Sequence, residues 1–224
     1  MKRIGPNEIT HMQFITFIFG IQVGVGQLSL PRLLAEKGGT DSWMALFIGW
    51  AASILVSLII VQIMSRKPDA NLIELLEAWM GKWAGKLGAV AIACYFFLYM
   101  ATVLIQSGLI IKGWIMPMTP LYVFIALFSV PSILIARQGF RVLGRYAEIV
   151  FFMFLPLSAF LLIPAGEGRL LHLLPLFKDG WRPIWNAAPS TLFSFAGFEF
   201  VFILYPFLQR KEKARSGILI ANSL

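Results

Sequence analysis

The sequence predicts an all-α membrane protein, a bundle of helices that crosses the bilayer several times. Of its 224 residues, 58% are hydrophobic and only 13% are charged, which is about half the charged share of an ordinary soluble domain. The mean hydropathy is +0.79. The charges are also missing from five long stretches of the chain. These observations exclude a disordered tail, a coiled coil and a soluble globular domain.

The uncharged stretches have the length of membrane-spanning helices. They cover residues 9–31, 42–65, 87–111, 113–136 and 149–166, and a sixth, 183–209, is interrupted only by Glu199. A helix needs roughly 20 apolar residues to cross the hydrocarbon core, and every backbone group must find its partner inside the segment. We therefore expect one integral membrane domain, 1–224, with six spans and the start of a seventh, at about 9–35, 43–64, 87–111, 120–136, 146–163, 189–208 and 216–224.

The basic residues predict the orientation. With a cytoplasmic N-terminus, the inner segments hold 13 of the 19 Lys and Arg residues and the outer segments hold 6, as the positive-inside rule requires. This placement explains the net charge of +8 without a nucleic-acid partner. Arg137, Arg141 and Arg145 follow one another at intervals of four, so on a helix they would share a face. We expect them to bind lipid phosphates, with docking of a partner or a gate as the alternative.

No pattern in the sequence is typical of an enzyme or a metal site. There is no nucleophile elbow, P-loop or pair of carboxylates, and His11 and His172 lie far apart. The single cysteine, Cys94, excludes a disulfide framework and a cysteine-rich metal site, and we expect it to be a small buried residue. The first span lacks a signal-peptide cleavage site. We expect a membrane-embedded protein that is not an enzyme and uses neither a cofactor nor a metal.

The segment between the second and third spans predicts a surface helix. Asn71 and Glu74 have the spacing of a capping box, in which each side chain hydrogen-bonds the other residue's backbone N–H. Apolar residues then recur at helical spacing: Leu72, Leu75, Leu76, Trp79 and Trp83. This pattern is typical of an amphipathic helix that lies in the membrane interface, here on the cytoplasmic side.

Two spans contain residues that interrupt helices. In the first, Gly24-Val25-Gly26 lies near mid-membrane, with Pro31 shortly after it. Glycine tolerates backbone conformations that helices avoid, but Gly20 and Gly24 also have the spacing of a close helix contact. The sixth span also has small residues near its middle and favours an interruption over close packing, because breaks at corresponding places in two halves point to a transporter-type binding site.

Such breaks provide binding groups from the backbone. The free N–H groups of Gly24, Val25 and Gly26 would begin a half-helix, whose positive end suits a carboxylate. Free carbonyls in the sixth span would suit an ammonium group, and they belong to four consecutive residues: Ser194, Phe195, Ala196 and Gly197. Together the breaks predict a site for a zwitterion such as an amino acid.

Side chains of the third and sixth spans are further candidates. Glu199 is an acid within a span, which costs a few kcal/mol. We interpret it as a group for amine binding or proton coupling, or else as a protonated acid in a hydrogen bond between helices. Tyr95 and Tyr99, with Thr102 and Gln106, form one polar-edged helix face. This face either lines a ligand cavity, with Tyr99 at mid-depth, or packs against other helices.

These segments resemble one family. Residues 23–32 are similar to the G-x-G-x-L-x-L-P-R segment of the spore germination permeases, the B subunits of nutrient germinant receptors. The resemblance covers essentially the whole chain and continues through these residues: Gly81-Lys82-Trp83, Gly85, Ser194-Phe195, Gly197-Phe198-Glu199, Pro206 and Arg210-Lys211.

The resemblance implies a fold and a cellular role. Members of this family belong to the amino acid–polyamine–organocation (APC) superfamily, with ten-odd spans in two inverted five-helix repeats, as in LeuT-like proteins. They lie in the inner membrane of bacterial endospores and act with A- and C-type subunits to sense nutrients and trigger germination. Their unwound helices correspond to residues 24–26 and 194–197, and their ligand-facing third helix to the face that carries Tyr99.

The sequence departs from this pattern in two respects. It ends within the seventh span, so we expect a C-terminally truncated bundle without the later helices. Residues 146–163 also contain no lysine, whereas some permeases of the superfamily use a lysine in the fifth span in place of a sodium ion. The leading hypothesis is a receptor subunit that binds an amino acid or similar nutrient. The alternatives are an amino-acid or ion permease and an incomplete fragment of one.

Overall fold

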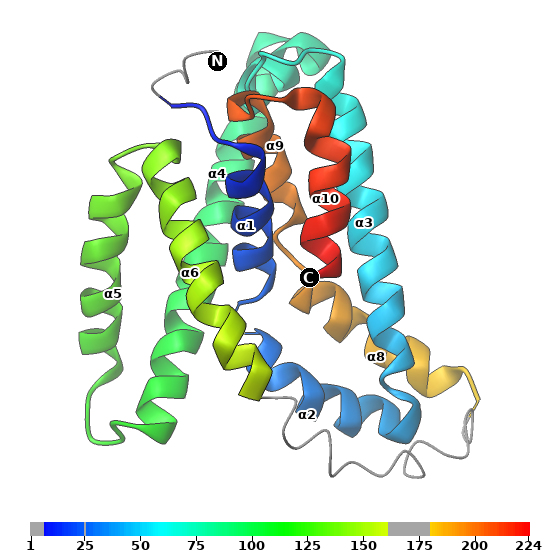
Figure 1. Ribbon diagram of the computed structural model, residues 1–224, viewed down its shortest axis with the longest axis vertical. Coiled ribbons are helices and arrows are strands. Elements are labelled where there is room, and N and C mark those ends of the chain that lie inside the picture. Colours follow the sequence, from blue (N-terminus) through cyan, green and yellow to red (C-terminus); the bar gives the residue numbers. More distant parts are fainter. Residues whose placement is uncertain (1–6, 25, 161–179) are drawn as a thin grey trace.

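The prediction of an all-α membrane protein is confirmed. The computed structural model of the chain describes residues 7–24, 26–160 and 180–224, and across these ranges it contains helices and a single isolated β-bridge (Figure 1). Four helical segments are long and apolar enough to cross a membrane: Met44–Ser65, Leu72–Trp114, Phe140–Phe160 and Arg182–Phe207. Leu121–Ala136 is a shorter apolar helix. Which segments cross the bilayer, and where, stays a prediction.

The first expected span is two helices. Helix α1 (His11–Gln22) has 12 residues and α2 (Gly26–Gly38) has 13, so neither half is long enough to cross a membrane alone. A capping box that the sequence analysis missed starts α1. The backbone N–H of Gln13 donates to Thr10 Oγ1 at 3.2 Å, and the N–H of Thr10 donates to Gln13 Oε1 at 3.0 Å. The chain therefore fixes the start of α1 locally, before any contact with other helices.

The best-buried part of the molecule surrounds α1. Helix α10 (Ala214–Ser223) packs against both α1 and α3 (Met44–Ser65), and α9 (Val201–Leu204) packs against α3 (Figure 1). Their shared core includes Phe14, Ile18 and Leu204, none of which is exposed. The N–H of Ile9 donates to Phe207 O at 2.9 Å, and the N–H of Gln209 donates to Ile9 O at 3.2 Å. This bridge joins the segment before α1 to the segment before α10.

Helix α4 (Leu72–Trp114) begins at the predicted capping box. The N–H of Glu74 donates to Asn71 Oδ1 at 2.9 Å, and the N–H of Asn71 donates to Glu74 Oε2 at 3.1 Å. The helix is bent at Gly81, where φ is 81° and ψ is 165°. Trp83, which was expected on the amphipathic helix, therefore lies beyond the bend. A side chain in this backbone conformation would be strained, which accounts for glycine there.

Helices α4, α5 (Leu121–Ala136) and α6 (Phe140–Phe160) expose many large apolar side chains. Soluble proteins rarely expose continuous apolar surfaces of this kind, and lipid is the solvent that suits them. Cys94 lies on α4 and is exposed. The expectation that it is buried was wrong, because most of α4 presents its side chains outward.

The three arginines do not lie on one helix. Arg137 caps the end of α5, Gly139 turns the chain with a φ of 90°, and α6 begins at Phe140. Arg141 and Arg145 are therefore on α6, and the expectation of a common face with Arg137 was wrong. The reason is the glycine in the left-handed region, which ends the first helix between the first and second arginine.

Helix α8 (Arg182–Ser194) begins seven residues before the expected start of the sixth span, and it packs against α2 and α3 (Figure 1). Thr191 Oγ1 donates to Ala45 O at 3.0 Å and Ala188 O at 2.7 Å. A Cβ on Gly49 would lie 2.7 Å from Thr191 Oγ1 and 3.0 Å from the Phe195 ring. The absence of a side chain at Gly49 is what lets α3 and α8 approach this closely.

This contact predicts the effect of adding one methyl group. Gly49→Ala should destabilise the protein by about 1–3 kcal/mol through overpacking, measured as a lower midpoint of thermal unfolding in detergent. Gly113→Ala is the control, because a Cβ there meets nothing within 4 Å. Equal midpoints for the two variants would contradict the close α3–α8 contact.

Candidate functional site

Two helices are interrupted in the interior of the molecule. Helix α1 ends at Gln22, and α2 starts at Gly26; Val25, a predicted ligand-binding residue, lies outside the described residues. Helix α8 ends at Ser194, and a short 3₁₀ turn follows at Phe198–Phe200. Between them Gly197 has a φ of 122°, a conformation that L-residues with side chains rarely adopt.

The two interruptions contact each other through their glycines. A Cβ on Gly197 would lie 2.5 Å from Ile21 Cγ2 and 3.5 Å from Gln22 Cγ, at the end of α1. A Cβ on Gly26 would lie 3.1 Å from Ser194 Oγ, at the end of α8. Each broken helix therefore lacks a side chain where the other one approaches, and this brings two sets of helix ends together.

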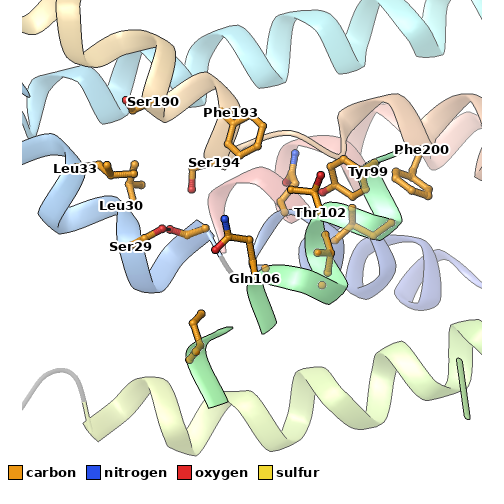
Figure 2. A pocket seen from close by; sticks show the side chains of 17 residues that line it. Ser29, Leu30, Leu33, Tyr99, Thr102, Gln106, Ser190, Phe193, Ser194 and Phe200 are labelled. Atoms are coloured by element: carbon orange, nitrogen blue, oxygen red, sulfur yellow. Dashed lines mark hydrogen bonds between the residues drawn. The ribbon is translucent and has the colours of Figure 1, made fainter. Parts of the chain in front are cut away.

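A cavity of about 420 Å³ lies beside the interruptions, within the range of small-molecule sites. Its wall comes from α1, α2, α4, α8 and the turn at Phe198–Phe200. In Figure 2, Ser194 lies above Ser29, and the α4 side chains of Tyr99, Thr102 and Gln106 lie to the right of both. The polar residues of the wall are Gln22, Ser29, Tyr99, Thr102, Gln106, Ser190 and Ser194.

The structure brings part of the predicted site to this cavity. Gly24, Gly26, Tyr99 and Ser194 line it, as do Thr102 and Gln106 of the polar-edged face. The other predicted residues lie outside its wall: Tyr95, Phe195, Ala196, Gly197 and Glu199. Gly197 packs on the end of α1 instead, and the ring of Phe195 faces Gly49. Whether any of these residues binds a ligand stays a prediction.

Glu199 forms two hydrogen bonds next to the cavity. Tyr95 Oη donates to Glu199 Oε1 at 2.6 Å, and the N–H of Gly197 donates to Glu199 Oε2 at 3.0 Å. The first bond joins α4 to the interrupted sixth span, and the second satisfies a backbone amide released by the interruption. Tyr99 and Phe200, whose ring centroids are 5.9 Å apart, line the cavity, whereas Tyr95 and Glu199 do not. Glu199 directly precedes Phe200, so it lies next to a residue of the wall.

Sequence reasoning missed a buried polar cluster of three residues on three helices. Gln22 of α1 is 8% exposed, Ser53 of α3 is 1% exposed and Asn222 of α10 is 7% exposed. Gln22 Nε2 donates to Ser53 Oγ at 3.0 Å and to Asn222 Oδ1 at 3.1 Å, and Ser53 Oγ donates to Asn222 Oδ1 at 2.8 Å. The available signal was amide and hydroxyl side chains within otherwise apolar segments.

The described part of the cavity wall is mostly apolar, with seven polar residues and no Asp, Glu, Lys or Arg. The described residues also contain no group of His, Cys, Asp and Glu that would hold a metal ion. Lys37 lies just outside, where its Nζ donates to Ser190 Oγ at 2.8 Å. Polar groups of a ligand would therefore be recognised here by dipoles and hydrogen bonds, and its apolar groups by the apolar part of the wall.

A family model described as "Spore germination protein" matches residues 8–224. The chain belongs to this family. It is 26% identical to Spore germination protein B2 of Bacillus subtilis (strain 168), over 97% of this chain and 60% of that protein. It is 28% identical to Spore germination protein GerQB of Bacillus cereus, over 99% of this chain and 62% of that protein.

More distant similarity reaches a protein named for transport. Uncharacterized transporter YcgH of Bacillus subtilis (strain 168) is 22% identical, over 92% of this chain and 49% of that protein. The chain thus spans about three fifths of the length of the first curated relatives. No solved structure matches it.

The contact between the interruptions predicts that Gly197 tolerates no side chain. Gly197→Ala should destabilise this spore germination family member, because the new Cβ would collide with Ile21 and the φ of 122° would be strained. The measurement is the thermal unfolding midpoint. Gly20→Ala is the control, since a Cβ there meets nothing within 4 Å. An unchanged midpoint for Gly197→Ala would contradict the packing of the two interruptions.

Proposed function

We propose that this chain is the B-type subunit of a nutrient germinant receptor, and that it binds an amino acid or similar small nutrient in the cavity and thereby triggers spore germination. The observation that carries the proposal is a cavity at the contact between two interrupted helices, with seven polar residues and no charged one in the described part of its wall. The family membership supports the cellular role.

The backbone provides the groups that a zwitterion needs. Helix α2 begins at Gly26, on the cavity wall, and its first N–H groups and positive dipole end favour a carboxylate. Helix α8 ends at Ser194, also on the wall, and the last carbonyls of a helix favour an ammonium group. Both ligand charges are then bound without placing a charged side chain in the membrane, which would be costly.

The proposal also specifies the membrane, the orientation and the partner subunits of the chain. The chain would lie in the spore inner membrane with a cytoplasmic N-terminus, in the APC-type inverted repeat, and would act with A- and C-type subunits. A nutrient can shift a conformational equilibrium only by binding one state more tightly than the other. A cavity whose wall comes from four helices and a turn is suited to this, because movement of any of them changes its shape.

A ligand-binding measurement tests the site. The purified protein in lipid nanodiscs is screened against the twenty proteinogenic L-amino acids by thermal shift, and hits are measured with labelled ligand. Gly26→Val should weaken binding at least tenfold, because its side chain would occupy the space beside Ser194. Gly113→Val should bind normally, since a Cβ there meets nothing within 4 Å and Gly113 does not line the cavity. Wild-type affinity in the Gly26 variant would contradict the proposed site.

Transport is the second candidate function. The relative named as a transporter and the carboxylate of Glu199 beside the cavity favour an amino-acid or ion permease with the same site. In this case, proteoliposomes should accumulate a labelled amino acid, and Glu199→Gln should reduce the rate at least tenfold. Binding without accumulation would favour the receptor, and a Glu199→Gln protein with the normal rate would exclude Glu199 as a coupling group.

A further inference from the structure

The buried cluster of Gln22, Ser53 and Asn222 contacts the cavity at one point. Gln22 is the last residue of α1 and lines the cavity, whereas Ser53 and Asn222 stand behind it on α3 and α10. We propose that the side-chain carbonyl of Gln22 accepts a hydrogen bond from the ligand's amino group, and that Ser53 and Asn222 are positioning residues that set this orientation. The inference rests on the proposed function and adds a specificity-determining residue to it.

Asn222, the member of the cluster on α10, fixes the orientation of the side-chain amides. Asn222 Nδ2 donates to Ile218 O, one turn earlier on α10, at 2.9 Å. Because Asn222 Nδ2 makes this hydrogen bond, Asn222 Oδ1 faces Ser53 and Gln22. An oxygen can only accept, and both neighbours must therefore act as donors.

The orientation of the Gln22 amide follows from the same hydrogen bonds. Ser53 has one hydroxyl proton, which it donates to Asn222 Oδ1 at 2.8 Å. Gln22 Nε2 donates toward both remaining acceptors, Ser53 Oγ at 3.0 Å and Asn222 Oδ1 at 3.1 Å, so the nitrogen side of this amide faces the cluster. A flipped Gln22 amide would place two oxygens against each other in a buried site. The Gln22 carbonyl oxygen is on the other side of the amide, makes no hydrogen bond with the described residues, and can only accept one from a ligand.

Gly197 also packs against the aliphatic part of the Gln22 side chain. A Cβ on Gly197 would lie 3.5 Å from Gln22 Cγ, so the second interruption packs against the side chain that the cluster orients. A fixed acceptor recognises a donor such as an ammonium group more strongly than a mobile one, because no ordering cost remains at binding. An amine is the donor that an amino acid offers.

Ser57 provides a matched control. It lies one turn after Ser53 on α3, is 0% exposed, and its hydroxyl has no hydrogen-bond partner among the described residues. Ser57→Ala removes the same atom from the same helix without breaking a hydrogen bond. Ser53→Thr keeps the hydroxyl and serves as the conservative variant.

The test compares ligands with and without an amino group. The probes are labelled L-alanine and propionate, L-valine and 3-methylbutyrate, measured on the full chain in nanodiscs. Ser53→Ala and Asn222→Leu should each weaken binding of the amino acids about tenfold, as for loss of a hydrogen bond to a charged group, and leave the deaminated acids within twofold. Ser57→Ala and Ser53→Thr should resemble the wild type.

A double-mutant cycle separates positioning from a general loss of structure. If Asn222 acts through Gln22, then Asn222→Leu should change the affinity less than twofold in a Gln22→Met background. Additive effects, or equal weakening of amino acids and deaminated acids, would overturn the inference.

If no probe binds the wild type, this outcome counts against the proposed function alone. The positioning role of Asn222 is then tested by an experiment without ligand. Thr102→Cys in a Cys94→Ser background places a thiol on the cavity wall. Asn222→Leu should slow its labelling by a methanethiosulfonate reagent at least threefold, because the released Gln22 side chain would enter the cavity. Ser57→Ala should not, and equal rates for the two variants would overturn the positioning role.

Discussion

A helix that stops in an apolar interior leaves backbone amides and carbonyls without partners, and apolar surroundings provide none. The arrangement of this protein depends on how it meets that constraint twice. The interruption after Gln22 and the one after Ser194 lie against each other, with Gly26 and Gly197 at the contacts. A side-chain carboxylate, Glu199, accepts from one of the released amides. The polar groups that result are gathered in one place, and a cavity lies beside them.

The same constraint explains two groups of polar side chains around the cavity. Buried amides and hydroxyls are costly unless they are hydrogen-bonded. Gln22, Ser53 and Asn222 satisfy one another across three helices, and Tyr95 with Glu199 joins a fourth helix to the second interruption. These contacts are directional, whereas apolar packing is not, so they set how the helices around the cavity are rotated relative to one another.

Local signals made much of the fold predictable. The charge-free segments indicated the apolar helices, Asn71 and Glu74 indicated the start of α4, and the glycines at 24 and 26 indicated where the first helix stops. The predictions were wrong where a single glycine or a tertiary contact determines where a helix ends or bends. Gly81 ends the amphipathic segment before Trp83, and Gly139 separates Arg137 from the next two arginines.

The site was predictable only in part. Tyr99 and Ser194 could be proposed because they lie at regular helical positions or beside a break. Gln22 and Asn222 are 200 residues apart in the sequence, and no periodicity relates them. Glu199 was recognised as unusual, but its partner Tyr95 depends on how α4 packs against the sixth span, which only three-dimensional structure provides.

The backbone bridge between Ile9 and the segment 207–209 has a mechanical consequence. It fastens α1 to the chain that leads into α10, and on the far side of the two glycine-containing joints α2 is packed against α8. Helix α3 packs against both α8 and α10 and so joins the two pairs. The bridge and the α2–α8 contact would have to break before the two interrupted helices could separate.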